Sequence, residues 1–600
     1  SDVCSSDLTV NSGVDLSIAN ARSIADDTSG TVTATIASSR VSDLTALRDP
    51  GSGNEENAWT ITVNSDDAAN EVTAAELNTL NAATSVAVNV NAVTELKASD
   101  LTDLTTFHSN RADFSNTGNI ATINLTNDGG GAGGSVDYSD LETIVDNYRA
   151  SGAAGINTNA VFKFADSDAI TIDDTGEVTA YLADIASGAL ALTNQTVTVN
   201  SGVDLSIADA RSIANDTSGA VTATIASSRV SDLTALRDPG SGNEENAWTI
   251  TVNSDDAANE VTAAELNTLN AATSVAVNVN AVTELKASDL TDLTTLHSNR
   301  AGFSNTGNIA TINLTNDGGG AGGSVDYSDL ETIVDNYRAA GAAGINTNAV
   351  FKFADSDAIT IDDTGEVTAY LADIESGALA LTNQTVTVNA GVGLSVADAK
   401  SIAADTTGTV TATIASGTHV SVLTELNSPS GSGTETNAWT ITLHSDDATR
   451  ATAAQLNTID DATSVAVTSA AITGLGASDL NDLSTLNGNA GNFSTLANIT
   501  AVTLTENGGS GNSNLDYSTL GSIIDAYQAR NGAVAFTPDA GDTIVIDNDA
   551  EVTAYVSDIT NGRLLLNDQA VTVNSGVDLS IANARSIADD TSGKIGRAHV

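Results

Sequence analysis

Thiol groups are almost absent from this sequence. Its 600 residues include one cysteine, Cys4, and no methionine. A single cysteine cannot form a disulfide within the chain, and a zinc–thiolate centre needs several cysteines. Disulfide-stabilised folds and zinc–thiolate sites are therefore excluded.

Positive charge is also scarce. The chain has 21 Lys and Arg against 77 Asp and Glu, a formal net charge of -56. Nucleic acids and anionic lipid surfaces bind to basic surfaces, so we expect neither as a partner. An acidic chain without thiols fits a secreted or cell-surface protein in salty or calcium-containing water. The alternative is an acidic surface that only keeps the chain soluble.

Long apolar runs are missing as well. No run reaches the roughly eighteen apolar residues that a membrane-spanning helix needs, so we expect no membrane insertion in this segment. Nevertheless 41% of the residues are hydrophobic. Val, Ile and Leu recur periodically along the chain, which favours a folded protein over a disordered one.

The two ends are unlike the sequence between them. Codons can be chosen for Ile595–Val600 whose reverse complement translates as the sequence of Asp2–Asp7. We therefore expect residues 1–8 and 594–600 to be a sequencing adapter read on opposite strands, and the rest to be an internal fragment of a longer gene. Cys4 falls in the first of these segments, so a cysteine nucleophile is not expected either.

The body of the chain is a long repeat. The string VNSGVDLS begins at Val10, Val199 and Val573, and its variant VNAGVGLS begins at Val388. Successive copies therefore begin about 190 residues apart. The predicted divisions are long repeats one to three and a truncated fourth copy, at residues 9–198, 199–387, 388–572 and 573–593.

Each long repeat contains shorter units of roughly thirty residues, the length at which a repeat period indicates a solenoid. Within a unit, a segment with Leu or Ile at helical spacing precedes a loop and then a run that alternates Val or Ile with small polar residues. Such alternation predicts strands with one buried face. In the first copy these runs are 31–36, 59–63, 86–90, 120–125, 169–172 and 196–199.

Apolar residues at helical spacing predict helices over 137–148 and 176–185. Two S/T-x-x-E pairs, Thr73 with Glu76 and Ser139 with Glu142, predict capping boxes at helix starts, and Thr452 with Gln455 repeats the first of them.

Strands that alternate with short helices predict the fold class α/β. Because units of this length cannot each close a core, we expect an elongated repeat solenoid of short parallel β-strands alternating with short helices. The alternative is a row of tandem β-rich domains of about 190 residues each.

Acidic residues gather in ADSDAITIDDTGE, where calcium could find several of the six to eight oxygen ligands that it takes. The alternative is solvated carboxylates at turns, where Asp is favoured in any case. Asp66 and Asp67, after a strand, form a smaller group. The residues of the predicted calcium site are Asp166, Asp168, Asp173, Asp174 and Glu177, with Asp355, Asp357, Asp362, Asp363 and Glu366 in repeat two.

The glycine loop GGSGNSNLD (508–516) resembles a degenerate repeats-in-toxin nonapeptide, a calcium-binding motif of proteins exported by type I secretion. The loop departs from that motif because Ser513 holds the aspartate position, and each long repeat has only one such loop. These departures favour a flexible linker.

Histidine and tryptophan offer little chemistry. His108 and His297 are equivalent, whereas His419 and His444 occur only in repeat three. We interpret all four as exposed loop histidines and expect no catalytic residue and no enzyme. The tryptophans Trp59, Trp248 and Trp439, one in each NAWTIT, are expected in the core or at a strand edge rather than on a carbohydrate-binding surface.

Repeats such as VTAAELNTLNAATSVAVNV (72–90), a thiol-free acidic composition and near-identical tandem copies resemble the repetitive stretch of very large secreted or cell-surface proteins of marine bacteria. These are proteins of the adhesin and type I secretion-target kind. The resemblance implies a structural spacer or coat, located outside the cell or on its surface.

We expect cell-surface or extracellular matrix components as partners, and calcium is the one cofactor that the sequence suggests. One alternative is a calcium-dependent extracellular binding module. A second is a polysaccharide-active extracellular protein.

Overall fold

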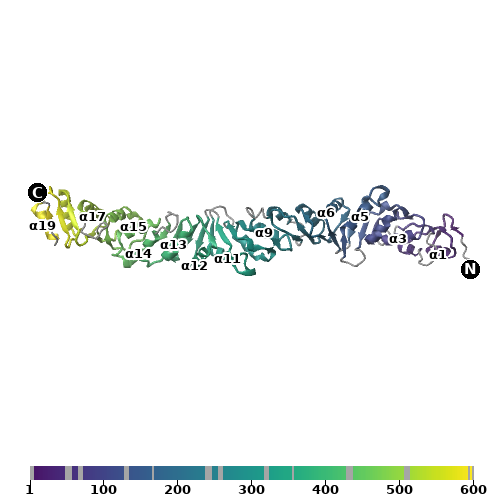
Figure 1. The fold of residues 1–600 in the computed structure, drawn as a ribbon, viewed down its shortest axis with the longest axis horizontal. Helices are drawn as coiled ribbons and strands as arrows, with labels where there is room; N and C mark the ends of the chain where they lie inside the picture. Colours follow the sequence, from purple (N-terminus) through teal and green to yellow (C-terminus); the bar gives the residue numbers. More distant parts are fainter. Residues whose placement is uncertain are drawn as a thin grey trace. The chain divides into compact units, whose positions relative to one another are not determined.

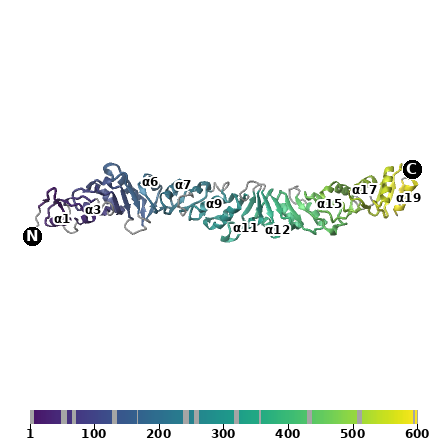
Figure 2. The same cartoon turned by 180° about the vertical axis from the view of Figure 1, so that it is seen from behind.

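The computed structural model divides the chain into two compact units. Unit 1 comprises residues 1–285 and 298–308, and unit 2 comprises residues 286–297 and 309–600. In both, short helices alternate with short strands along the chain (Figures 1 and 2). The residues that the structure describes are 6–47, 57–64, 72–126, 134–164, 168–236, 246–253, 261–315, 323–353, 357–427, 437–505, 514–591 and 595–597.

The strands of unit 1 are β1 (Leu8–Thr9), β2 (Asp15–Leu16), β3 (Val32–Ile36), β4 (Ala58–Thr60), β5 (Val88–Asn89), β6 (Glu95–Ser99), β7 (Phe114–Ser115), β8 (Thr122–Leu125), β9 (Ser135–Asp137), β10 (Val161–Phe164), β11 (Ala169–Ile172), β12 (Leu190–Ala191), β13 (Thr196–Val199), β14 (Asp204–Leu205), β15 (Val221–Ile225), β16 (Ala247–Thr249), β17 (Val277–Asn278) and β19 (Phe303–Ser304). Its helices are α1 (Ile18–Asp26), α2 (Val41–Leu44), α3 (Ala74–Ala82), α4 (Leu101–Ser109), α5 (Tyr138–Arg149), α6 (Thr175–Ala186), α7 (Ile207–Asp216), α8 (Val230–Leu233) and α9 (Ala263–Asn270).

The strands of unit 2 are β20 (Thr311–Leu314), β21 (Ser324–Asp326), β22 (Val350–Phe353), β23 (Ala358–Ile361), β24 (Leu379–Ala380), β25 (Thr385–Val388), β26 (Gly393–Leu394), β27 (Val410–Ile414), β28 (Ala438–Thr440), β29 (Gly474–Ser478), β30 (Ala501–Leu504), β31 (Asn514–Asp516), β32 (Ala535–Thr537), β33 (Thr543–Ile546), β34 (Ala570–Val573) and β35 (Ile595–Arg597). Its helices are α11 (Tyr327–Arg338), α12 (Thr364–Glu375), α13 (Val396–Asp405), α14 (Val420–Leu423), α15 (Ala453–Asp461), α16 (Leu480–Gly488), α17 (Tyr517–Asn531), α18 (Asp549–Thr560) and α19 (Ile581–Asp590). The elements β18 (Glu284–Ser288) and α10 (Leu290–Ser298) contain residues of both units.

One coil of the chain contributes to two sheets. In unit 1, β10 is followed along the chain by β11 and then α6, and the next coil begins with β12 and β13. β10 pairs with β12 in one sheet, while β11 pairs with β13 in another. Every strand pairing in the described part of the chain is parallel, as expected when a helix carries the chain back to the start of each new strand.

Branched apolar side chains stack from coil to coil. Ile170 pairs with Val136 of the preceding coil and with Val197 of the following one, and all three are buried. Their neighbours on the same strands are partly exposed, in the pattern of a sheet with one face on the core. Each strand therefore buries its apolar face only when both neighbouring coils are present.

The predicted solenoid is confirmed, and the alternative of separate domains is wrong. The predicted boundary between repeats one and two falls inside β13, which pairs with β11 before it and β15 after it. In unit 2, β25 contains the next boundary and pairs in the same way with β23 and β27. The parallel sheets therefore continue across the predicted boundaries.

Each of the six alternating runs contains a strand or an isolated bridge at its predicted place. The other strand of this coil, β10, was not predicted, although its VFKF also alternates buried with more exposed residues. One capping box was also wrong. Helix α5 begins at Tyr138, and its N-cap is Asp137, whose side chain accepts a hydrogen bond from the Ser139 amide. The capping boxes at Thr73 and Thr452 are confirmed.

Buried polar side chains join adjacent coils. Asn246 Oδ1 accepts a hydrogen bond from the Val221 amide at 2.7 Å, and the Thr273 hydroxyl donates to the Trp248 carbonyl at 2.8 Å. The same bonds recur at Asn57, Asn437, Thr84 and Thr463. These bonds satisfy backbone groups that burial would otherwise leave unpaired.

None of the helices in the described residues has both the length and the apolar character of a membrane span.

Gly219 lies where two coils approach closely. A Cβ atom at this position would lie 2.2 Å from the Gln195 carbonyl oxygen, which is too close for van der Waals contact. We expect Gly219→Ala to lower the free energy of unfolding by more than about 2 kcal/mol, because backbone must move to relieve the clash. Urea unfolding followed by circular dichroism measures the effect.

The control for this substitution is Gly307→Ala, because a Cβ there meets no atom within 4 Å. Equal unfolding midpoints for the two variants would show that close coil contact does not constrain residue 219.

Candidate functional site

Those predicted calcium residues of repeat one that the structure describes lie at both ends of one strand. Asp168 lies before β11 and is buried, whereas Asp173, Asp174 and Glu177 follow the same strand at its other end. Four residues of extended strand span roughly 13 Å. Repeat two has the same arrangement, with buried Asp357 before β23 and Asp362, Asp363 and Glu366 after it. Asp166 and Asp355 lie outside the described residues, as do Asp66, Asp67 and Gly508–Ser513 of the glycine loop.

The carboxylates after β11 form the start of helix α6. Asp174 is the N-cap, and its Oδ1 accepts hydrogen bonds from the amides of Gly176 and Glu177 at 2.7 and 3.0 Å. Glu177 turns back, so that its Oε2 accepts from the Asp173 amide at 2.7 Å. In repeat three the cap is Asn548, whose side chain accepts two amides in the same way. A neutral side chain therefore makes the same cap.

Tyrosine–aspartate pairs connect neighbouring helices. The Tyr327 hydroxyl of α11 donates a hydrogen bond to Asp373 Oδ2 of α12 at 2.6 Å. Burial raises the pKa of Asp373, while the bond from Tyr327 lowers it in part. Burial also raises the pKa of Tyr327, which therefore remains a donor. Tyr138 with Asp184 and Tyr517 with Asp558 form equivalent pairs at 2.7 and 2.6 Å.

Two of the histidines contact backbone. His108 lies in the last turn of α4, with Nε2 2.9 Å from the Ala154 carbonyl, and His297 is 2.8 Å from the Ala343 carbonyl. The predicted loop location is therefore wrong for both, since His297 also lies on a helix, α10.

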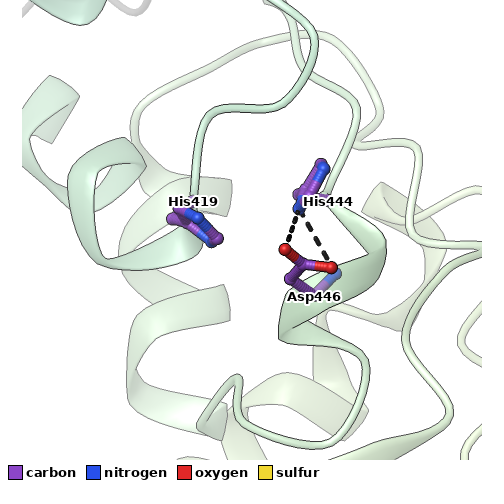
Figure 3. Close-up of side chains that lie close together, drawn as sticks. All are labelled: His419, His444 and Asp446. Atoms are coloured by element: carbon purple, nitrogen blue, oxygen red, sulfur yellow. Dashed lines mark hydrogen bonds and ion pairs between the residues drawn. The ribbon is translucent and has the colours of Figure 1, made fainter.

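The other two histidines lie together. His419 is the N-cap of α14, and His444 is the N-cap of a short 3-10 helix at Ser445–Asp447. Their ring centroids are 5.2 Å apart, and the side chains of His419, His444 and Asp446 face one space (Figure 3). One ligand atom from each of these three side chains lies within 4.8 Å of the other two. In the described residues this is the one group of three or more His, Cys, Asp or Glu side chains spaced to hold a metal ion.

The tryptophans are buried, as predicted for core residues. Trp59, Trp248 and Trp439 are each no more than 2% exposed. The alternative, in which their rings form a carbohydrate-binding surface, is therefore wrong.

A hollow of about 340 Å³ lies between α17 and α18 in repeat three. Gly521 lines it, at the position that Glu142 and Glu331 occupy in the other repeats. Its other polar residues include Asp525, Glu551 and Arg563. Repeat three therefore lacks, at the edge of this hollow, a side chain that the other two repeats have.

No protein-family model matches the chain, and no curated protein matches it either.

Substitutions of Asp174 can show whether this residue acts as a helix cap or as a calcium ligand. Because asparagine caps helices as well as aspartate does, we expect Asp174→Asn to change the free energy of unfolding by less than about 0.5 kcal/mol. We expect Asp174→Ala to lower it by about 1 kcal/mol. Urea unfolding with calcium and with a chelator measures both variants. A loss in Asp174→Asn that appears only with calcium would identify Asp174 as a ligand.

The Tyr327–Asp373 pair should make stability depend on pH. The folded-state pKa of Asp373 is raised, so its favourable contribution is complete at acidic pH and is lost as pH rises through that pKa. Tyr327→Phe removes the bond that lowers this pKa, so the carboxylate becomes costlier to bury. We expect a loss of about 1–2 kcal/mol at neutral pH and a smaller loss at about pH 5, measured by urea unfolding.

Tyr337→Phe is the control, because the Tyr337 hydroxyl donates to the Leu293 carbonyl instead of a carboxylate. The decrease in the free energy of unfolding caused by Tyr337→Phe should not change with pH. A pH-independent loss in Tyr327→Phe as well would contradict the role of Asp373.

Proposed function

We propose that this chain is a structural spacer region of a large extracellular or cell-surface protein, of adhesion or surface-layer type, without catalytic activity. The observation that carries the proposal is that coils contact one another through the same residue pairs in successive long repeats. Ile170 pairs with Val197 in repeat one, and Ile359 pairs with Val386 in repeat two. An added copy would bury the same faces as the copies beside it, so copy number can change length without changing the surface chemistry.

The acidic surface supports the same proposal. A net charge of -56 keeps such a chain soluble and discourages association between copies. Partners in this role are cell-surface or extracellular matrix components, bound by domains that the spacer holds away from the cell.

A calcium-dependent extracellular binding module is the second candidate. Asp173, Asp174 and Glu177 support it because three carboxylates lie within one helix start. If calcium held this segment, chelation would loosen the structure, whereas the spacer proposal needs no ion.

The spacer proposal predicts how length depends on copy number. Deletion of residues 199–387 joins Thr198 to Val388 and restores the sequence TVTV of β13 and β25. A long repeat contains about six coils of roughly thirty residues, and strands paired between adjacent coils lie about 4.8 Å apart. We therefore expect the maximum dimension in small-angle X-ray scattering to fall by roughly 30 Å. Insertion of a second copy of 199–387 should increase it by the same step.

The proposal that copy number sets the length would be contradicted if the deletion and the insertion changed the maximum dimension by different amounts, or did not change it. The same measurements with calcium and with a chelator separate the two candidates, since only the calcium module should change its dimensions.

A further inference from the structure

We propose that His419, His444 and Asp446 form a binding site for a transition-metal ion of borderline softness, foremost Zn²⁺, in the third long repeat. This site goes beyond the spacer function, which requires no metal. Its three side chains belong to two neighbouring coils, so a bound ion would connect one coil to the next.

The distances suit a metal ion. His444 Nδ1 lies 3.7 Å from Asp446 Oδ2, and the three ligand atoms lie within 4.8 Å of one another. With bonds of 2.0–2.1 Å, two ligands of a tetrahedral zinc ion are about 3.4 Å apart. The pair from one coil is close to that separation already. His444 Nδ1 also accepts a hydrogen bond from the Asp446 amide at 3.3 Å, which an ion bound to this nitrogen would replace. The side chains of His419 and Asp446 are 51% and 68% exposed, so small rotations can bring all three ligands to the ion.

Asp447 orients the first histidine. Both of its carboxylate oxygens lie 3.3 Å from His419 Nδ1, and Oδ2 also accepts a hydrogen bond from the Val420 amide at 2.9 Å. Asp447 is buried, so its position is fixed. With the proton on Nδ1, His419 donates to Asp447 and presents Nε2 as the ligand atom. Metal-binding histidines commonly have such a carboxylate behind them.

The other long repeats lack both histidines at the equivalent positions. Arg40 and Arg229 are the N-caps of the helices that correspond to α14, and Asn64 and Asn253 stand where repeat three has His444. The sequence Ser-Asp-Asp that follows is the same in all three copies. At these positions repeat three therefore differs from the other repeats by two imidazoles, which meet in space beside an aspartate that all three sequences contain.

The ligand types select the metal. Calcium prefers six to eight oxygen ligands, whereas imidazole nitrogen suits zinc, copper, nickel and cobalt. Three protein ligands leave at least one coordination position for water. The site is therefore distinct from the predicted calcium residues in both place and chemistry.

The test is a titration of the full chain with Zn²⁺ alone, followed by calorimetry, in a Cys4→Ser background that removes the one thiol. Excess magnesium occupies the many surface carboxylates during the titration. We expect one zinc ion per chain. His419→Arg and His444→Asn introduce the residues of the other repeats, so both should fold, and each should lower the affinity at least about tenfold. Titration with Co²⁺ should give visible absorption bands of a nitrogen-ligated ion, which both variants should lose.

The control is His297→Asn, which introduces the residue found at the equivalent position, Asn487, and should leave zinc affinity unchanged. Asp447→Asn should lower the affinity about 10- to 100-fold while the metal-free unfolding midpoint stays near that of the parent. Two results would overturn the proposal: no saturable zinc binding by the parent chain, or the same affinity in the parent, His419→Arg and His444→Asn at equal metal-free stability.

Discussion

The hydrogen-bonding groups of each strand can be satisfied only by the coils before and after it, and the rest of the structure depends on this constraint. Strands such as β11 have four residues, and helices such as α6 have twelve. Elements this short are only marginally stable when isolated. Ile170 loses contact with water because Val136 and Val197 cover it from both sides. Stability is therefore a property of neighbouring coils together, and the repetition of the sequence follows from it.

The constraint divides the residues of a coil into two classes. Some side chains that bond to the next coil keep their identity in all three long repeats, as Asn57, Asn246 and Asn437 do. Positions that face water have changed, as when Glu142 of repeat one becomes Gly521 of repeat three. Outward positions can therefore acquire new chemistry without loss of the fold. The candidate metal site and the hollow beside Gly521 are both made at such positions.

Most of this fold can be predicted from the sequence, because apolar residues recur at different intervals in strands and in helices. Alternating runs such as 169–172 coincide with strands, and the solenoid follows from units too short to close a core. The remaining strands were harder to predict, since a strand such as β12 has only two residues, too few to show a period. The start of α5 was misplaced because Asp137 competes with Ser139 as the cap, and sequence alone does not decide between them.

The candidate site was missed for a different reason. His419 and His444 are far apart in sequence, and their meeting depends on the length of a coil. Hydrogen bonds between adjacent coils join residues 25 apart, as Thr84 with Trp59, and the two histidines have this same spacing. The signal was thus present in the sequence, but it becomes readable only when the coil length is known. The acidic clusters show the opposite relation, because residues close in sequence, Asp168 and Asp173, lie at opposite ends of a strand.

Charge and ligand type contribute differently to metal binding in so acidic a chain. A net charge of -56 attracts every cation, and salt screens that attraction at distances beyond about 10 Å. Attraction of this kind raises the local concentration of calcium, magnesium and zinc alike, so it cannot distinguish between them. Discrimination requires ligand atoms that one ion prefers, and nitrogen is rare here because the chain has five histidines. Two of those five lie side by side at His419 and His444, with Asp447 holding one of the rings. In the residues that the structure describes, this pair is therefore the place where ligand type favours a transition metal over the ions that carboxylates attract.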